Sequence, residues 1–461
     1  MNPMRLPEAI FVGPSQFGSA VADAVGNGRL LHLTHIPTIP GREDPAGFVL
    51  ALWERDGVPQ CIAAPGRTPT RPSQAGLRSA PLEEQHLEAE GLLWAEPPVS
   101  HAVLGQGVFT LPLGPVRGAV AEAAAWRFAT MGDELLQLEM RFGYKRRHME
   151  EQLSSADPRE APRIAERITA TSPVAHAWAA SICWEAALGI PVSPEASMAR
   201  AVMAELERIY SHLGDLASLA DSTGLPAGAA ELWAMKEEVL RLCHRATGHR
   251  YQRGRIVLGG LNAPLESVAD GPVLLRAVQD RVHQVIRQLD HSPSFLDRLH
   301  RTGRLPPDTA TWLAPVGPVG RASGRPYDVR WDLPYVPYGT ALAPARAGET
   351  AGDAWARYRV RVQELDAATE WLLRHWSIAF EADAARPLRS GRPEDGLWLG
   401  RTEAPGGELL YLLHPGHWMR VRPPACVHWL ALPYALAEGH VLQDVPIVDA
   451  SFALSVAAMD R

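Results

Sequence analysis

Cysteine is scarce in this chain of 461 residues, which holds only Cys61, Cys183, Cys243 and Cys426. Each stands alone in the sequence, and no two of them form a C-x-x-C pair. The spacing therefore resembles neither a disulfide framework nor a zinc site. Separated thiols of this kind indicate a reducing cytoplasm and buried positions in a core.

Long apolar runs are missing as well. No stretch reaches the roughly 18 apolar residues that span a bilayer, and the start MNPMRLPEAIFVG lacks the basic-then-apolar order of a secretory signal. Lysine occurs only at Lys145 and Lys236, and the formal net charge of −7 is too mild to favour nucleic-acid binding. We therefore expect a protein that is soluble or peripheral on a membrane partner and that binds no nucleic acid.

The chain contains enough hydrophobic residues to form a large core, since 46% of its residues are hydrophobic and 21% are charged. Residues 1–105 are predicted to form a small α+β domain with strands at residues 30–34 and 47–53. The Pro-, Gly- and Arg-rich residues 65–76 are predicted to be a loop or linker.

Residues 106–461 are predicted to form a second, larger domain. Residues 108–141 have the pattern of a β-hairpin that turns at Gly132 and Asp133. Helical periodicity then dominates, and Ser172-Pro173 and Gly189 mark the start and end of the first long helix. With four further amphipathic helices, the pattern predicts an α+β fold whose main part is a helical bundle core with a β-rich N-terminal portion.

Nine short segments carry a family resemblance, and they occur in the family's order across residues 107–461. They are LPLGPVRG at 111–118, RFGYKRRHMEE at 141–151, AERITATSPVAHA at 165–177, ELERIYSHLGDL at 205–216, RATGHRYQRGRIVLGG at 245–260, GPVGRASGRPYDVRWDLPY at 317–335, EAPGGELLYLL at 403–413, RVRPPACVHW at 420–429 and DVPIVDASFALSVAAMDR at 444–461. In these segments the chain resembles the D subunit of respiratory complex I and the large subunits of membrane-bound [NiFe] hydrogenases, including that of formate hydrogenlyase. Residues 82–94 weakly resemble the complex I C subunit.

The resemblance also shows where this chain departs from the family. The four cysteines that hold nickel in the hydrogenases correspond to Thr169, Ser172, Ser455 and Ala458. Nickel and iron require soft thiolates at such a site, and hydroxyl groups do not replace them. We therefore expect this chain to bind no metal and no cofactor of its own.

The residues that bind quinone in complex I are altered too. The histidine that follows Gly-Pro in the family is replaced by a stretch that ends in Arg117, and the tyrosine at the quinone headgroup corresponds to about Ala170. The residues expected to line the remodelled cavity are Arg117, Ala170, Ser172, Arg321, Arg330 and Ser455.

Two candidates in the first long helix have competing interpretations. Ser172 is either a remnant of the metal site or, as we favour, the N-cap of the helix. His176, one turn later, is either a proton-transfer group that lines the old cavity or a core histidine that is hydrogen-bonded to a backbone carbonyl.

A polar stripe follows in the next helix, where Glu205, Arg208, His212 and Asp215 recur at steps of three, four and three. Such a stripe is usually a solvated face. Because it lies in a family-like segment, we favour a buried ionic network of the kind that often marks a proton path. These four residues and His176 are the catalytic candidates.

Arginines and histidines near the end of the chain complete the candidates. Arg321 and Arg330 flank a Gly- and Pro-rich loop. They either lie near the old metal site or, as we favour, anchor the loop through Asp328 or Asp332. His414, His417 and His428 suggest a metal site only weakly, because no carboxylate or thiol completes the set.

Two functions remain open on this basis. In the first, the chain is an oxidoreductase-type subunit that passes electrons from a neighbouring [4Fe–4S] subunit, like the complex I B subunit, to a quinone or another acceptor. In the second, it is a redox-silent scaffold or coupling subunit with a vestigial site. Both place it at the cytoplasmic face of the membrane, with antiporter-like membrane subunits as further partners. The [4Fe–4S] subunit is expected to dock where Ser172, Arg321 and Ser455 converge.

Overall fold

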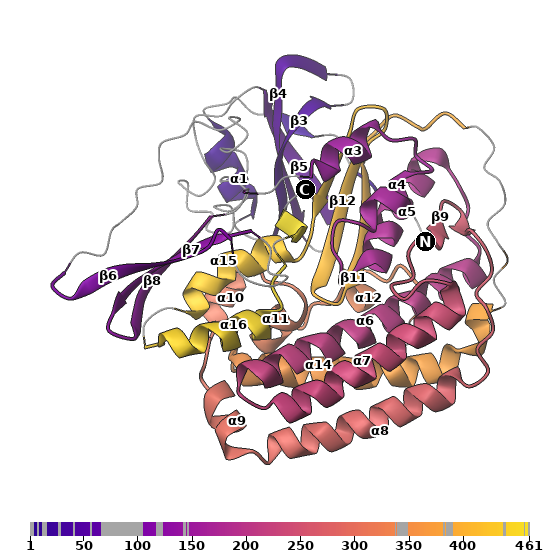
Figure 1. Cartoon of the computed structure of the whole chain (residues 1–461). Helices are drawn as coiled ribbons and strands as arrows, with labels where there is room; N and C mark the ends of the chain where they lie inside the picture. Colours follow the sequence, from indigo (N-terminus) through magenta and orange to yellow (C-terminus); the bar gives the residue numbers. More distant parts are fainter. Residues whose placement is uncertain are drawn as a thin grey trace.

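The computed structural model describes the helical part of the chain almost without gaps (Figure 1). The described residues are 4–6, 9–11, 16–25, 29–39, 42–55, 58–65, 105–116, 123–141, 144, 147–336, 338, 349–380, 383, 391–436, 439–455 and 457–459. The predicted linker therefore lies outside the described residues except for Pro65, and Arg117 lies outside them as well.

Five long helices form the core, as the periodicity predicts. They are α5 Pro173–Leu188, α6 Pro194–Ser222, α7 Pro226–Thr247, α8 Gly271–Asp290 and α14 Ala354–His375. The apolar stripes of α6, α7, α8 and α14 meet in one buried cluster, and these four helices lie side by side in Figure 1. The αL residues Gly189 and Gly248 end α5 and α7, because glycine adopts a positive φ without a steric penalty.

Shorter helices connect the core to its surroundings. They are α1 Phe17–Val25, α3 Met149–Ser155, α4 Ala161–Ala165, α9 Pro293–Leu299, α10 Pro307–Leu313, α11 Gly317–Ala322, α12 Val329–Asp332, α15 Ala425–Ala435 and α16 Val445–Phe452, with 3₁₀ turns η3 Ser377–Phe380, η4 Leu442–Asp444 and η5 Ala457–Met459. Of the helices in the described part of the chain, none combines the length and the apolar character needed to cross a bilayer.

A four-stranded sheet packs on one side of α5. Its strands β11 Trp398–Ala404, β12 Gly407–His414 and β13 Trp418–Arg422 are antiparallel neighbours, and β1 Met4–Arg5 pairs with the outer edge of β11. Gly400 permits the close approach of α5 to β11, because a Cβ at this position would lie 2.2 Å from the carbonyl oxygen of Ala179. This sheet and the core helices enclose the loop that carries α11 and α12 (Figure 1).

The N-terminal residues form a second four-stranded sheet. Its strands are β2 Ile10–Phe11, β3 Arg29–Ile39, β4 Arg42–Arg55 and β5 Val58–Pro65, in the order β2-β5-β4-β3. The predicted strands 30–34 and 47–53 fall inside β3 and β4, whereas β5 and α1 were not predicted. Leu50 and Leu52 share a cluster with Leu410 and Leu412, so this sheet packs on the β11–β13 sheet. The domain boundary near residue 105 stays a prediction.

Two small sheets complete the fold. A three-stranded sheet has the order β6-β7-β8, formed by β6 Val108–Leu113, β7 Ala125–Met131 and β8 Glu134–Arg141, and it extends from the body at the left of Figure 1. The turn at Gly132 and Asp133 is confirmed, but residues 108–141 form three strands where a single hairpin was expected. The other is the pair β9 Ile256–Val257 and β10 Gly260–Leu261. The α+β fold with a helical core is confirmed.

Candidate functional site

The polar stripe of α6 is buried in the protein. The side chains of Glu205, Arg208 and His212 have 0% exposed surface, and that of Asp215 has 22%. The stripe is therefore not a solvated face: α6 packs against α14, and the stripe contacts α12 through Arg330 and β11 through Arg208. Burying several charges is expensive unless each is paired, so the partners of these groups define the site.

Arg330 from α12 joins the stripe to Asp328. Its guanidinium donates to both carboxylate oxygens of Glu205 (3.1 and 3.0 Å) and, through Nε and Nη2, to both oxygens of Asp328 (3.0 and 2.7 Å). Arg208 donates from Nε to Glu205 (3.0 Å) and from Nη2 to the backbone carbonyl of Glu403 (2.7 Å). Two arginines thus share one buried carboxylate.

Arg321 from α11 binds the remaining carboxylates. It donates to Glu364 on α14 (2.7 Å), to Glu403 on β11 (3.0 Å) and to Asp328 (3.2 Å). Arg321 and Arg330 therefore anchor their loop through Asp328, as favoured from the sequence. Asp332 contributes differently, because its carboxylate accepts the backbone N–H of Asp328 (2.9 Å).

The charges of this network do not balance. Three guanidinium groups, those of Arg208, Arg321 and Arg330, face the carboxylates of Glu205, Asp328, Glu364 and Glu403. Burial, followed by the neighbouring charge of Asp328, raises the pKa of Glu403 to about 7. Burial opposes ionisation of Asp328 too, but Arg330 and Arg321 lower its pKa to about 2. The raised pKa of Glu403 fits a network in which carboxylates outnumber guanidinium groups.

His212 connects this network to the protein surface. Its Nε2 lies 2.9 Å from Oε2 of Glu364, and its Nδ1 lies 3.8 Å from Oδ2 of Asp215. Asp215 also accepts a hydrogen bond from Nε of Arg361 (3.1 Å). An imidazole between two carboxylates accepts a proton at one nitrogen and releases one from the other. Glu364, His212 and Asp215 thus form a row, called the relay below, from a fully buried carboxylate to one that reaches solvent. Its Glu364–His212 link is a hydrogen bond, whereas 3.8 Å between His212 and Asp215 is an ion-pair distance at which Nδ1 makes no hydrogen bond.

The residues that the family resemblance places at nickel-ligand positions lie near one another in the structure. Arg147 donates from one nitrogen, Nη2, to the backbone carbonyls of Ile168 (2.9 Å) and Ala457 (2.7 Å), next to Thr169 and Ala458. The hydroxyl groups of Thr169 and Ser172 bond to each other at 2.7 Å, and the Ser455 hydroxyl accepts the N–H of Ala458 at 3.3 Å. Hydroxyl and methyl groups at these positions do not fit nickel, which requires thiolates here.

Ser172 occupies the N-cap position of α5, but its side chain does not cap the helix. The cap comes from Glu207 on α6, whose carboxylate accepts the N–H groups of Val174 (2.6 Å) and Ala175 (3.1 Å). The favoured N-cap role of the Ser172 hydroxyl is therefore wrong, because that hydroxyl is bonded to Thr169. Ala170, beside it, is exposed, so this corner of the isolated chain is open to solvent.

Glu207 is a site residue that sequence reasoning missed. It is fully buried, and burial raises its pKa to about 8 even though the N–H groups of Val174 and Ala175 favour the carboxylate. The sequence carries one relevant signal, since Glu207 and Ser211 are four residues apart on the face of α6 that touches the start of α5.

His176 is buried against the sheet. Its Nδ1 lies 2.8 Å from the hydroxyl of Tyr411 on β12, and burial lowers its pKa to about 3. The ring is therefore neutral at physiological pH. This geometry agrees with a core histidine, although its partner is a tyrosine hydroxyl where a backbone carbonyl was expected, and it argues against proton transfer by His176.

The three C-terminal histidines do not meet in one group. His414 bonds to Asp395 (3.0 Å) and stacks on His417, with ring centroids 4.1 Å apart. His428 donates from Nε2 to the carbonyl of Val316 (2.9 Å) in a different part of the fold. Within the described ranges, no three His, Cys, Asp or Glu side chains are arranged to hold a metal ion.

Glu207→Gln is expected to change how stability depends on pH. A glutamate with a folded-state pKa near 8 keeps a proton that the unfolded chain, with its ordinary value of 4.5, has lost. Its contribution is complete at low pH and disappears as the pH rises toward 8. Between pH 6 and 8 the wild type should therefore lose on the order of 1–2 kcal/mol more stability than Glu207→Gln. Urea unfolding at both pH values checks this, and parallel pH profiles of the two proteins would contradict it.

Two family models match parts of the chain. The family described as "Respiratory-chain NADH dehydrogenase, 49 Kd subunit" matches residues 223–375, and "Nickel-dependent hydrogenase" matches residues 147–217. The second match contains Thr169, Ser172 and the polar stripe of α6, whereas the first contains Arg321, Arg330 and Glu364. The candidate site therefore combines residues from both matched regions.

Curated relatives are similar to most of the chain at low identity. Formate hydrogenlyase subunit 5 of Escherichia coli (strain K12) is 27% identical over 76% of this chain, and the match spans 63% of that protein. NADH-quinone oxidoreductase subunit 4 of Thermus thermophilus is 26% identical over 84% of this chain and 100% of that protein. The membrane-bound hydrogenase subunit alpha of Pyrococcus furiosus is 25% identical over 76% and 87% of the two chains.

A solved structure shares the fold. A chain in the structure of the membrane-bound sulfane sulfur reductase, an archaeal respiratory membrane complex, aligns with a TM-score of 0.67 at 19% identity. The alignment covers 79% of this chain and 100% of that chain. At this identity the likeness establishes the fold.

Proposed function

We propose that this chain, a homologue of complex I D subunits and of membrane-bound hydrogenase large subunits, is an oxidoreductase-type subunit of a respiratory membrane complex. It takes electrons from a neighbouring [4Fe–4S] subunit and supports the reduction of a quinone or another small acceptor, without nickel of its own. It sits on the cytoplasmic face of the membrane, beside antiporter-like membrane subunits.

The buried relay of Glu364, His212 and Asp215 carries this proposal. Reduction of a quinone consumes two electrons and two protons, and a buried site receives those protons only through titratable groups. The relay ends at Asp215, whose side chain is 22% exposed. A buried ionic network is a poor way to gain stability, since apolar replacements are often equally good. A role in proton movement explains its charges better.

The open corner at Ala170 and Ser172 supports the proposed partner. Ala170 is exposed, Ser172 is half-buried, and the segment of Ser455 lies close by because Arg147 bridges Ile168 and Ala457. Arg321, by contrast, is fully buried in the ionic network. A [4Fe–4S] subunit would therefore contact Ser172 and Ser455, whereas Arg321 would stay inside the ionic network.

A redox-silent scaffold is the second candidate. The bond between the Thr169 and Ser172 hydroxyls favours it, because these two groups satisfy each other and offer no strong ligand. A scaffold would need the ionic network only to keep its folded structure. Breaking the relay should therefore lower the rate of acceptor reduction in the first function but not in the second.

His212→Gln in the assembled complex distinguishes these functions. Glutamine hydrogen-bonds to Glu364 but does not transfer protons, so we expect acceptor reduction to fall about a hundredfold, within the usual range for lost proton transfer. The control His291→Gln alters an exposed histidine that bonds to the Arg287 carbonyl and should leave the rate unchanged. Duroquinone reduction by membranes that carry each variant gives the readout. Full activity of His212→Gln at unchanged complex yield would favour the scaffold.

A further inference from the structure

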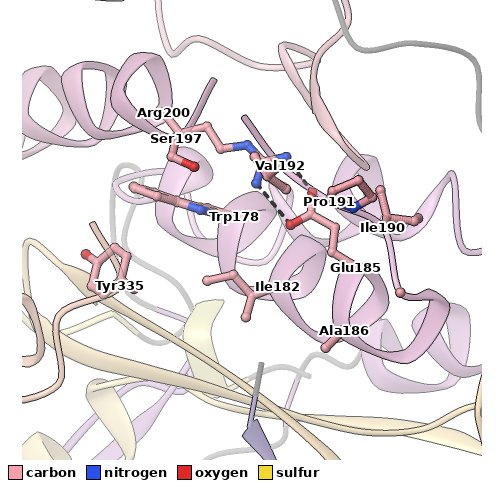
Figure 2. A pocket seen from close by; sticks show the side chains of 11 residues that line it. Trp178, Ile182, Glu185, Ala186, Ile190, Pro191, Val192, Ser197, Arg200 and Tyr335 are labelled. Carbon is pink, nitrogen blue, oxygen red and sulfur yellow. Dashed lines mark hydrogen bonds and ion pairs between the residues drawn. The ribbon is translucent and has the colours of Figure 1, made fainter. Parts of the chain in front are cut away.

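A pocket of about 470 Å³ opens beside the C-terminal half of α5, apart from the ionic network (Figure 2). Its walls come from α5, from residues 189–192, from the start of α6 and from Tyr335. The volume falls in the range of small-molecule sites, which are mostly apolar with a few placed polar groups. No side chain of the ionic network is among its lining residues.

One wall carries a saturated ion pair. Arg200 donates to both oxygens of Glu185 (3.1 and 2.6 Å) and to the carbonyls of Val257 (2.7 Å) and Gly260 (3.1 Å). Glu185 also accepts the N–H of Gly259 (2.8 Å). Because every charge on this wall already has partners, the pocket has no free guanidinium or carboxylate for an ionic ligand.

The rest of the lining is aromatic and apolar. The rings of Trp178 and Tyr335 meet edge to face, with centroids 5.0 Å apart, and Ile182, Pro191 and Val192 add apolar surface. The Tyr335 hydroxyl accepts the backbone N–H of Glu403 (3.1 Å). Burial raises the pKa of Tyr335 far above its usual value, so this wall is neutral.

Trp178 supplies a hydrogen-bond donor to the pocket. Its side chain is 98% buried, with 2% exposed, yet its indole N–H bonds to no acceptor in the described parts of the chain, where Trp371, Trp376, Trp398 and Trp429 all donate to carbonyl groups. In Figure 2 the indole nitrogen lies on the edge of the ring that faces the Glu185–Arg200 pair. This N–H is not among the fully buried atoms of the described residues that lack a partner. It therefore reaches the open space of the pocket, where it can donate to an acceptor atom of a bound molecule.

We propose that this pocket binds a small, neutral, apolar molecule whose carbonyl oxygen accepts a hydrogen bond from the indole N–H of Trp178. The ligand's body lies against Tyr335 and Ile182, and its neutrality follows from the saturated ion pair of Arg200 and Glu185. This site is separate from the Glu364–His212–Asp215 relay, and the inference does not depend on the proposed electron transfer.

Duroquinone and durene test the proposal as a matched pair of probes. Both carry four methyl groups on a six-membered ring, but only duroquinone has carbonyl oxygens. We expect the purified chain to bind duroquinone about tenfold more tightly than durene, the effect of one hydrogen bond. We also expect a downfield shift of one indole N–H resonance, in ¹⁵N-tryptophan-labelled protein, that is absent from Trp178→Phe.

Two variants keep the test decisive. Trp178→Phe retains an aromatic wall and should bind both probes with equal affinity. Ser197→Leu places a larger side chain at a half-buried lining position and should weaken both probes at least tenfold, with unchanged thermal unfolding as evidence that it folds. Equal binding of the two probes to the wild type, binding that Ser197→Leu leaves unaltered, or a partner's side chain seated in the pocket of the assembled complex would each overturn the proposal.

Discussion

Arg208→Met should lower the free energy of unfolding by about 3–5 kcal/mol, the usual cost of leaving a buried charge without its partner. Arg208 has no exposed surface and donates to Glu205 and to the carbonyls of Glu403 and Ala404. Methionine fills much of the same space but donates no hydrogen bond. The two carbonyls lose a donor, and the excess of buried carboxylates increases. Denaturant unfolding of the purified chain measures the effect.

Arg241→Met is the matched control. Arg241 is paired with Glu237 on α7, but 74% of its side chain is exposed, and exposed pairs contribute about 0–1 kcal/mol. If Arg208→Met proved as mild as Arg241→Met, the buried contacts of Arg208 with Glu205 and with the two carbonyls would not exist in solution.

Gly317→Ala should cost about 2–5 kcal/mol, from a strained positive φ and an unrelieved backbone contact. Gly317 begins α11 with a φ of +61°, and a Cβ there would lie 2.1 Å from the carbonyl oxygen of Gly406. The turn between β11 and β12 would have to move, and with it the contact of Arg321 with Glu403. We therefore expect a lower free energy of unfolding and a weaker contact between Arg321 and Glu403.

Gly416→Ala separates the two contributions to that effect. Gly416 also has a positive φ, +78°, but a Cβ there would meet nothing within 4 Å. It should therefore cost only the backbone strain, about 1 kcal/mol. Equal unfolding midpoints for Gly317→Ala and Gly416→Ala would show that the close approach of α11 to the β11–β12 turn does not exist in solution.

The helices of this fold could be predicted because their signals are local. Ser172-Pro173 and Gly189 set the ends of α5, and apolar steps of three and four residues placed the buried face of α6. β11 was missed because WLGRTEA is polar and does not alternate, and all seven of its residues are nevertheless buried. Its Arg401 and Glu403 are inside because they pair with charges from other elements.

Only the part of the site that lies on α6 could be predicted, because the other residues come from distant parts of the sequence. The α6 stripe could be found by its spacing. Glu364, however, lies 152 positions after its partner His212, and Glu403 lies a further 39 positions along the chain, so no periodicity connects them. The cap of α5 by Glu207 joins residues 33 positions apart. Such pairings depend on how helices pack, which one sequence does not reveal.

The metal content of the complex that holds this chain shows whether the chain works without nickel beside an iron–sulfur partner. A tagged chain is purified from native membranes in mild detergent, washed with chelator and measured by elemental analysis. We expect about four or more iron atoms per chain, supplied by a [4Fe–4S] partner. We expect nickel near zero, because Thr169, Ser172, Ser455 and Ala458 offer no thiolate. About one nickel atom per chain, or recovery of the chain alone without iron, would contradict it.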